Sequence, residues 1–470
     1  MATPSLDRST SLLDAWKVLG VTSLAIFAAS LDSTVLFVAF PSIRATFPTV
    51  SVAQLSWVLN AYTIVFAAFL VFAGGLADFI GRRKTFLIGV TIFTLASVLC
   101  GLASSPALLI SARVLQAIGG VLITPASLAL VLSAFPHSKR ATAVSLWGAV
   151  GAIAAAVGPS LGAAIVQTAG WRWAFFLNLP VGIVTIGLGR QILSESRQTD
   201  SRKISDLFGV LLSIVAIGLI AFATVQSSEW GWNNRLTLLS LAGGELRWDC
   251  FSIAPVRVEA PAIDLKLFQN ANYRFANLAT FVFYIVFTAI FFGFVLFLTQ
   301  VWGYSTLNAG LAITPGPLLV AVIAPFAGRI AVCDGGHRVL LVPGGILLAI
   351  GGFYLLTQAG TTPAFRTIWL PSTILIGMGV GLTLPILSSA AVHDLPPTQF
   401  AIGSAVNQVI RQLGSVFGVA LVVVLVGKTS SQTALVVFDR LFLVPIVGGL
   451  LISALSFNIQ TQRSNSMRGK

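Results

Sequence analysis

Three ionisable residues, Asp32, Arg113 and Arg411, lie inside long apolar runs of the sequence. A charged side chain at the centre of a membrane-spanning helix costs roughly 2.5–3.5 kcal/mol on insertion scales, so such residues usually face a polar cavity and have a partner. A carboxylate such as Asp32 could bind and release protons there, which would couple it to a proton gradient. Both residues also have a structural alternative. Asp32 could accept a hydrogen bond from a neighbouring helix, and the long Arg113 side chain could extend to the membrane interface.

Polar residues share the helix faces of both arginines. Gln116 follows Arg113 by three positions, whereas Asn407 and Gln408 precede Arg411 by four and three. Side chains at these spacings lie on one side of a helix. They either line a polar cavity or form hydrogen bonds between helices, and the sequence does not separate the two for Asn407 and Gln408. The residues that we expect to line a substrate cavity are Trp57, Asn60, Tyr62, Gln116, Asn407, Gln408 and Arg411.

Two further patterns concern packing and loops. A stripe of small residues at alternating spacings of three and four predicts the close approach of two helices, with Pro159 as a site for a kink. The stripe consists of Gly148, Gly151, Ala155, Gly158 and Gly162.

The second pattern is a glycine-rich basic loop at 74–84, which taken alone could be an ordinary loop of a membrane protein. Its marked residues are Gly74, Asp78, Gly81, Arg82 and Arg83.

The composition shows which elements must position these residues. Of 470 residues, 56% are hydrophobic and only 9% are charged, which excludes a soluble globular or a disordered protein. The apolar runs are about 20 residues long and do not alternate, so they predict membrane-spanning helices rather than a β-barrel. Three scattered cysteines and three scattered histidines predict neither a disulfide framework nor a metal site.

We count fourteen apolar runs, of which the eighth, 236–256, is weak because three charged residues follow one another closely at 245–249. With all fourteen crossing and the N-terminus in the cytoplasm, 20 of the 28 Lys and Arg residues face the cytoplasm. This bias follows the positive-inside rule, and it explains the net charge of +13 without nucleic acid. We therefore expect a multi-pass protein of the inner membrane with both termini cytoplasmic.

Several motifs together resemble the major facilitator superfamily of secondary transporters, and within it the fourteen-span drug:proton antiporter branch. They include the 74–84 loop, the Arg113–Gly120 segment and the Gly158–Gly162 segment. The string around Asp32 and the Trp171–Gly182 segment resemble motifs of that branch in particular. Phe79 and Ala163 depart from the family pattern in two of these motifs.

The resemblance implies an all-α fold of two six-helix halves with two extra central spans. The expected layout is a cytoplasmic tail at 1–16, an N-terminal half at 17–193, two linker spans at 194–256, a C-terminal half at 257–458 and a basic tail at 459–470. It further implies proton coupling through Asp32 and Arg113, a conformational latch in the 74–84 loop, and an antiporter motif formed by Gly158, Pro159 and Gly162.

We therefore expect proton-coupled efflux of amphipathic organic compounds, with no enzymatic activity and no cofactor, since no ATP-binding motif is present. The expected partners are the substrate, protons and the lipid bilayer; we expect a monomer, with periplasmic adaptor proteins as an open option. Two alternatives remain: export of an endogenous metabolite, or an inactive, non-transporting membrane protein. The second arises from tracts 245–256 and 331–338, which break the family pattern through genuine divergence or compensating reading-frame changes.

Overall fold

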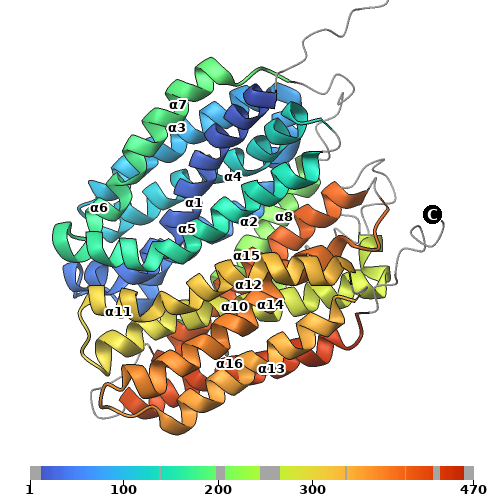
Figure 1. Ribbon diagram of the computed structural model, residues 1–470. Coiled ribbons are helices and arrows are strands. Elements are labelled where there is room, and N and C mark those ends of the chain that lie inside the picture. Colours follow the sequence, from blue (N-terminus) through green and yellow to red (C-terminus); the bar gives the residue numbers. More distant parts are fainter. Residues whose placement is uncertain are drawn as a thin grey trace, which may run out of the picture.

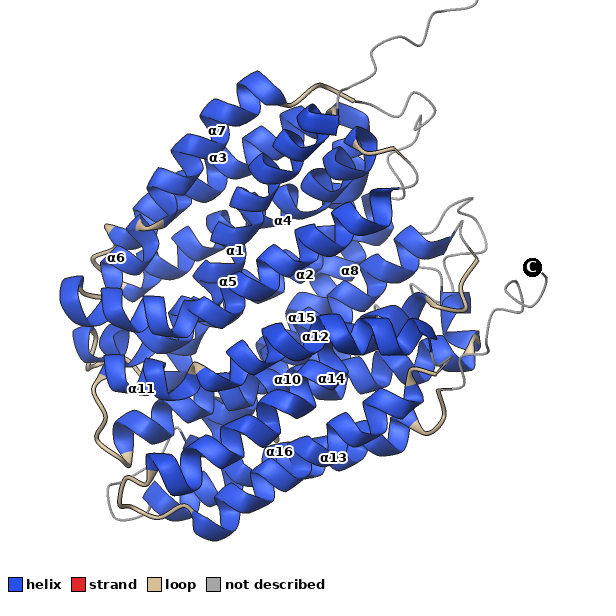
Figure 2. Ribbon diagram, in the orientation of Figure 1, coloured by secondary structure: helices blue, strands red, loops and turns tan. Residues whose placement is uncertain are grey.

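The computed structural model describes residues 12–136, 139–196, 207–243, 265–333, 336–396, 399–426 and 434–459. These parts of the chain form helices and contain no β-strand (Figure 2). Twelve of the helices in the described ranges are long and apolar enough to cross a membrane. The prediction of an all-helical polytopic membrane protein is therefore confirmed, whereas the count of fourteen spans is not supported.

The N-terminal half contains six candidate spans, the last of which is divided in two at Leu177. Its helices are α1 (Leu12–Thr46), α2 (Val52–Ile80), α3 (Arg82–Gly101), α4 (Pro106–Ala134), α5 (Arg140–Ala169), α6 (Trp171–Phe176) and α7 (Asn178–Ile192). The side chains of Ser51 and Ser105 accept hydrogen bonds from backbone N–H groups in the first turns of α2 and α4, which otherwise lack partners.

The C-terminal half repeats the six-span arrangement, with its second span divided at Thr314. Its elements are η3 (Leu265–Gln269), α10 (Ala271–Gln300), α11 (Thr306–Ile313), α12 (Pro315–Cys333), α13 (Arg338–Gln358), η4 (Phe365–Trp369), α14 (Leu370–Val392), α15 (Phe400–Val426) and α16 (Ala434–Ser456). The unusual tract 331–338 lies between α12 and α13; residues 334–335 are outside the described chain, and so is tract 245–256.

A further helix, α8 (Leu207–Trp230), lies between the halves and packs against both α2 and α15 (Figure 1). A shorter helical segment at 235–243 turns back along it, which brings Gly243 next to Leu219. Leu207–Trp230 and 235–243 lie within the stretch 194–256 in which two linker spans are expected, and residues 244–256 are outside the described chain. In the described chain they do not add to the twelve candidate spans.

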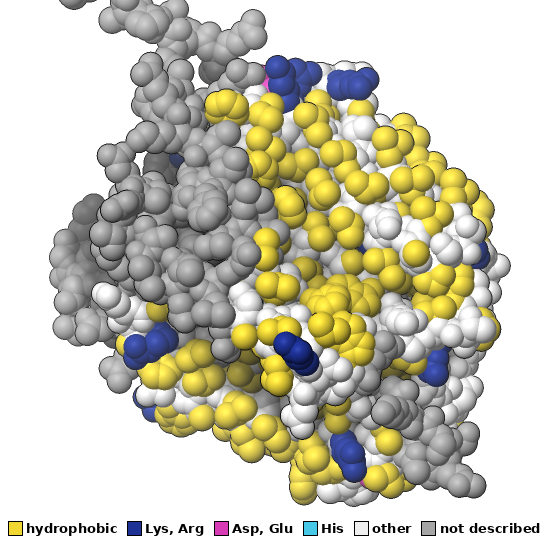
Figure 3. Space-filling model, turned by 180° about the vertical axis from the view of Figure 1, so that it is seen from behind, with side chains coloured by type: hydrophobic (Ala, Val, Ile, Leu, Met, Phe, Trp, Pro, Cys, Tyr) yellow, Lys and Arg dark blue, Asp and Glu magenta, His cyan; other side chains and the backbone are white. Residues whose placement is uncertain are grey.

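The two ends of the bundle are named here by the connections that they carry. The Arg82 end holds the α2–α3 and α4–α5 connections, and the Arg172 end holds the α1–α2 and α5–α6 connections. Between them, the outward surface is largely apolar: Figure 3 shows hydrophobic side chains over most of the described part of one face, with few lysines and arginines among them. Such a surface suits a lipid environment, because it would be costly in water.

Contacts between the halves occur towards the Arg172 end. The backbone N–H of Leu307 in α11 donates to Oε1 of Gln167 in α5 at 2.8 Å. Phe40 of α1 packs edge-on against Phe292 of α10, with ring centroids 4.9 Å apart. A Cβ atom added at Gly310 of α11 would lie 2.7 Å from the Pro159 carbonyl oxygen of α5, so only glycine permits this approach. At the Arg82 end, a Cβ added at Gly74 or Gly75 would meet nothing within 4 Å.

The small-residue stripe of α5 packs against α1, as its spacing predicts. A Cβ added at Gly158 would lie 1.9 Å from Oγ1 of Thr34, and one at Gly162 would lie 2.7 Å from a methyl group of Val35. At Gly148, in the same helix, a Cβ would meet nothing within 4 Å. The two helices are therefore in closest contact at the Gly158–Gly162 segment.

Gly158→Ala should lower the stability of the purified protein by about 1–3 kcal/mol, because the added methyl group overpacks the α1–α5 contact. Thermal unfolding in detergent would show this as a lower midpoint. Gly148→Ala is the matched control, since it makes the same change in the same helix without a clash. Equal midpoints for the two variants would contradict a tight contact at Gly158.

Candidate functional site

A buried ion pair connects α1 and α4. Nη1 of Arg113 lies 2.5 Å from Oδ2 of Asp32, and the two side chains are only 2% and 1% exposed. Both residues lie well inside candidate spans, as their positions in the sequence predict. A charge-assisted hydrogen bond of this kind is strong, yet each partner alone would be costly to bury.

Amide side chains complete the surroundings of the carboxylate. Oδ1 of Asp32 accepts hydrogen bonds from Nε2 of Gln116 at 2.8 Å and from Nδ2 of Asn178 at 2.9 Å. Ser97 lies beside them, and its Oγ accepts from the same two amides at 2.8 and 3.3 Å. Oε1 of Gln116 in turn accepts from Nη1 of Arg113 at 2.5 Å. Helices α1, α3, α4 and α7 thus meet in one polar network, called here the Asp32 network.

The arginine also holds α2 in place. Its Nε donates to the carbonyl oxygen of Val58 at 3.0 Å, and its guanidinium lies 4.4 Å from the centre of the Tyr62 ring. The Tyr62 side chain is buried, and so is Cys100, whose Sγ lies 3.7 Å from Oε1 of Gln116. Val58 and Tyr62 of α2 and Cys100 of α3 therefore surround the arginine side of the Asp32 network.

Protonation of the carboxylate would rearrange the Asp32 network. A proton on Asp32 would remove its negative charge and weaken the ion pair to Arg113. It would also turn one acceptor position into a donor, which forces the amides of Gln116 and Asn178 to adjust. Since the partners lie on four helices besides α1, with Val58 on α2, the change would reach most of the N-terminal half.

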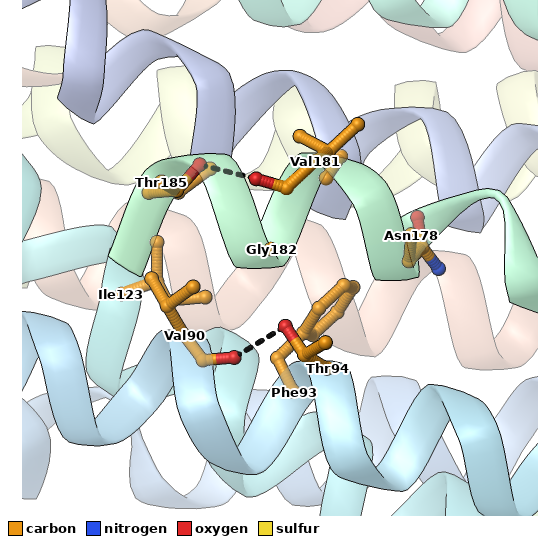
Figure 4. A pocket seen from close by; sticks show the side chains of 10 residues that line it. Val90, Phe93, Thr94, Ile123, Asn178, Val181, Gly182 and Thr185 are labelled. Carbon is orange, nitrogen blue, oxygen red and sulfur yellow. Dashed lines mark hydrogen bonds between the residues drawn. The ribbon is translucent and has the colours of Figure 1, made fainter. Parts of the chain in front are cut away.

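Asn178 also borders a small pocket between α1, α3, α4 and α7 (Figure 4). The pocket is roughly the size of a single water molecule, and the nearby polar groups include Thr94 and Thr185. Both hydroxyls donate to backbone carbonyls of their own helices, of Val90 and Val181 respectively. This small pocket thus adjoins the Asp32 network through Asn178.

The C-terminal half holds a second polar cluster around Arg411. Its Nε donates to the Tyr284 hydroxyl at 2.6 Å, and its Nη1 donates to Oε1 of Gln408 at 2.8 Å. Asn407 is buried and donates to Oδ1 of Asn277 at 2.9 Å, which is a hydrogen bond between α15 and α10. Arg411 and Gln408 remain partly exposed. The structure therefore keeps Arg113 and Arg411 apart, one in each half.

The other two cavity candidates lie on α2. Asn60 is fully buried and donates to the Ser56 hydroxyl at 3.3 Å, while its Oδ1 has no hydrogen-bond partner among the described residues. Trp57 is partly buried and donates to Oε1 of Gln226 in α8 at 3.4 Å. Asn60 thus lies within the packed bundle, whereas Trp57 lies at the contact with α8.

Residues 74–84, predicted as a loop, are helical except for Gly81, because α2 continues to Ile80 and α3 begins at Arg82. The name 74–84 loop is kept for this junction. Gly81 has a φ of 119°, a conformation that favours glycine, and its position permits the Glu195 carboxylate to lie against it. The Glu195 carboxylate accepts hydrogen bonds from the backbone N–H groups of Arg83 at 3.1 Å and Lys84 at 3.2 Å, so it caps the N-terminus of α3. The backbone N–H of Arg82 donates to the Ser196 carbonyl oxygen at 3.1 Å. The Asp78 side chain is outside the described part of the structure.

Three residues of these sites were not assigned a role from the sequence. Asn178 stands within a recognised motif, yet its distance of 146 positions from Asp32 conceals the contact. Ser97 is an ordinary serine in an apolar helix, and nothing in its neighbours indicates a polar network. Glu195 could have been noticed in the sequence, because it is the one acidic residue in the segment 79–199.

Replacing one partner of the ion pair should destabilise the protein more than replacing both. Arg113→Gln leaves the Asp32 charge buried without its cation, which should lower the free energy of unfolding by about 3–5 kcal/mol. Asp32→Asn likewise leaves the Arg113 charge buried without its anion and should lower it by a similar amount. The double variant Asp32→Asn/Arg113→Gln should recover most of this loss. Chemical or thermal unfolding of the purified variants measures it.

The control is Asp14→Asn, which removes an exposed partner of Lys17 on the same helix and should change stability by less than about 1 kcal/mol. If the double variant lost as much stability as the sum of the two single variants, Asp32 and Arg113 would not be coupled.

Comparison with known proteins agrees with this architecture. Residues 22–419 match the model of the family described as Major Facilitator Superfamily. The chain is similar to the multidrug resistance protein Stp of Mycobacterium tuberculosis (strain CDC 1551 / Oshkosh), with 35% identity over 85% of this chain and 74% of that protein. It is also similar to the cephamycin export protein CmcT of Amycolatopsis lactamdurans, with 31% identity over 90% of this chain and 87% of that protein.

Among solved structures, the inward open conformation of the xylose transporter XylE from E. coli superposes with a TM-score of 0.63. The match covers 96% of this chain and 98% of that chain, at 14% identity, and therefore shows a shared fold. With these matches, a transporter is indicated rather than an enzyme. On the extent of the family match and the identity to Stp, this chain belongs to the Major Facilitator Superfamily.

Proposed function

We propose that this chain exports amphipathic organic compounds across the plasma membrane in exchange for protons. The observation that carries the proposal is the Asp32 network, in which one buried carboxylate contacts an arginine and two amides. Relatives named for multidrug resistance and for cephamycin export support the direction of transport. Proton coupling rests on the chemistry of Asp32.

In the proposed cycle, a proton from outside neutralises Asp32 and releases Arg113 from its ion pair. The two residues belong to α1 and α4, and Arg113 also holds the Val58 carbonyl oxygen of α2. Loss of the ion pair therefore changes the packing of three helices at once. Release of the proton to the cytoplasm would restore the pair and reset the cycle.

The described conformation is, in this proposal, the one that opens to the cytoplasm. The contacts of Leu307 with Gln167 and of Gly310 with Pro159 hold the halves together at the Arg172 end, while a Cβ added at Gly74 near the Arg82 end would meet no described atom within 4 Å. We assign the Arg82 end to the cytoplasm because basic residues favour that side of a membrane. The 74–84 loop would then act as a latch only in the opposite, outward-open conformation.

We further propose membership of the fourteen-span drug:proton antiporter branch, with α8 and the segment from 235 onwards as the two additional spans. Two observations support this assignment. Residues 235–243 turn back along α8, and α8 itself packs against α2 and α15. The contact of Trp57 with Gln226 ties this linker to the N-terminal half.

The substrate is proposed to lie between the halves near the middle of the bundle, where Gln408 and Arg411 are partly exposed. Export of an endogenous metabolite is the second candidate, and the similarity to a cephamycin export protein favours keeping it. A screen of dyes, antibiotics and metabolites in cells that lack other pumps distinguishes the two. Failure of the intact gene to transport any of them would instead favour an inactive protein.

Asp32→Asn should abolish substrate efflux driven by a pH gradient in proteoliposomes, because the amide cannot take up and release the coupling proton. Exchange of labelled for unlabelled substrate, which needs no net proton movement, should persist. The measurement is dye accumulation with and without an imposed pH gradient.

Asp14→Asn serves as the control, since it alters an exposed carboxylate of the same helix and should leave efflux unchanged. Undiminished gradient-driven efflux by the Asp32→Asn protein would overturn the coupling role of Asp32. Loss of exchange together with loss of efflux would point to a folding defect, which the unfolding midpoint detects.

A further inference from the structure

Within the described chain, Arg411 differs from Arg113 because no carboxylate pairs with it. Among the described residues, no Asp or Glu oxygen lies within 4.0 Å of its guanidinium, and its hydrogen bonds go to the neutral groups of Tyr284 and Gln408. These use two of the five N–H donors of an arginine. A cation inside a candidate span therefore retains both its charge and three donors for another partner.

The Arg411 side chain lies on the interior side of α15. Val424, which is 45% exposed, marks the outward face of this helix. At 100° per residue, Gln408 and Arg411 lie about 160° and 220° around the helix from Val424, so both lie on the opposite face. Arg411 thus faces α10, where the Tyr284 hydroxyl accepts its hydrogen bond, rather than the side of α15 that carries Val424.

A row of aromatic rings on α10 starts at this cation. The Arg411 guanidinium lies 4.9 Å from the centre of the Tyr284 ring. The Tyr284 ring is 6.0 Å from Phe287, Phe287 is 4.8 Å from Phe291, and Phe291 is 6.5 Å from Phe37 of α1. Seven residues of helix from Tyr284 to Phe291 rise about 10 Å, which is the length of a fused two- or three-ring compound.

We infer that Arg411 binds the carboxylate, or an equivalent anionic group, of an aromatic amphipathic substrate whose ring system packs along Phe287 and Phe291. The inference rests on the proposed function as an exporter. Arginine suits this role because its planar fork matches a carboxylate, and the partly desolvated surroundings strengthen the pair. A cationic substrate would meet Arg411 with like charge, and Asp32 is already held by Arg113.

Binding of three pyrene probes to the purified full chain in lipid nanodiscs tests the inference. Pyrenebutyrate is the anion, pyrenebutanol the neutral analogue and pyrenebutyl-trimethylammonium the cation. The wild-type protein should prefer the anion. In Arg411→Gln, the affinity for the anion should fall about tenfold to a hundredfold, as expected for lost charged hydrogen bonds, and the neutral probe should change less than about twofold.

Two variants keep the result interpretable. Arg411→Lys retains the charge and should keep part of the anion preference, which a purely structural role would not require. Arg329→Gln, a change of an exposed arginine in α12 of the same half, should leave all three affinities unchanged. Phe287→Ala should weaken all three probes similarly, because the aromatic contact does not depend on charge.

Equal affinity of the wild-type protein for the three probes would overturn the inference. So would an equal loss for all three probes in Arg411→Gln. The assay uses no proton gradient, so Asp32→Asn should retain the anion preference even though its gradient-driven efflux is lost. If Asp32→Asn exported normally while Arg411→Gln lost its anion preference, only the coupling proposal would fail.

Discussion

The structure depends on one costly element, a carboxylate and a guanidinium buried together in the middle of the N-terminal half. Asp32 and Arg113 are almost fully removed from solvent, and neither charge is tolerable there without the other. The amides of Gln116 and Asn178 donate further hydrogen bonds to the carboxylate, and the Val58 carbonyl oxygen accepts one from the guanidinium. Five helices are thereby tied to the charge state of one carboxylate. In the proposed cycle, a proton on Asp32 would act where these helices are held together.

The two halves share a six-span arrangement but differ in whether the arginine inside one of their candidate spans is paired with a carboxylate. The N-terminal arginine is neutralised by its own carboxylate, while Arg411 in the C-terminal half contacts only neutral groups in the described chain. Aromatic rings extend from Arg411 along α10 as far as Phe37 of α1. Under the proposed function, the N-terminal half would carry the proton and the C-terminal half would contact the substrate. Helix α1 holds Asp32 and meets Phe291 of α10 through Phe37.

Close backbone packing provides the rigid surroundings that such a mechanism needs. Gly158 and Gly162 bring α5 against α1, and Gly310 brings α11 against α5. Packing of this kind is stiff, so the halves would change their relative position as bodies rather than deform. Helix α8 packs on α2 and α15 and thereby covers one of the seams between the halves. The polar contact of Trp57 with Gln226 fixes it to α2.

Hydropathy and length alone identify a helical membrane protein here, because they suffice to recognise spanning helices. Asp32, Arg113 and Arg411 could also be found from their positions, since a charge inside an apolar run is conspicuous without any knowledge of its neighbours. The pairing of Asp32 with Arg113, and the contacts of Asn178 and Ser97 with this pair, became known from the fold, because contacts across 81 and 146 positions leave no periodic pattern. The fold likewise shows that Asn407 bridges two helices whereas Arg411 keeps donors available, for helical spacing sets the face of a side chain and only packing supplies its partner.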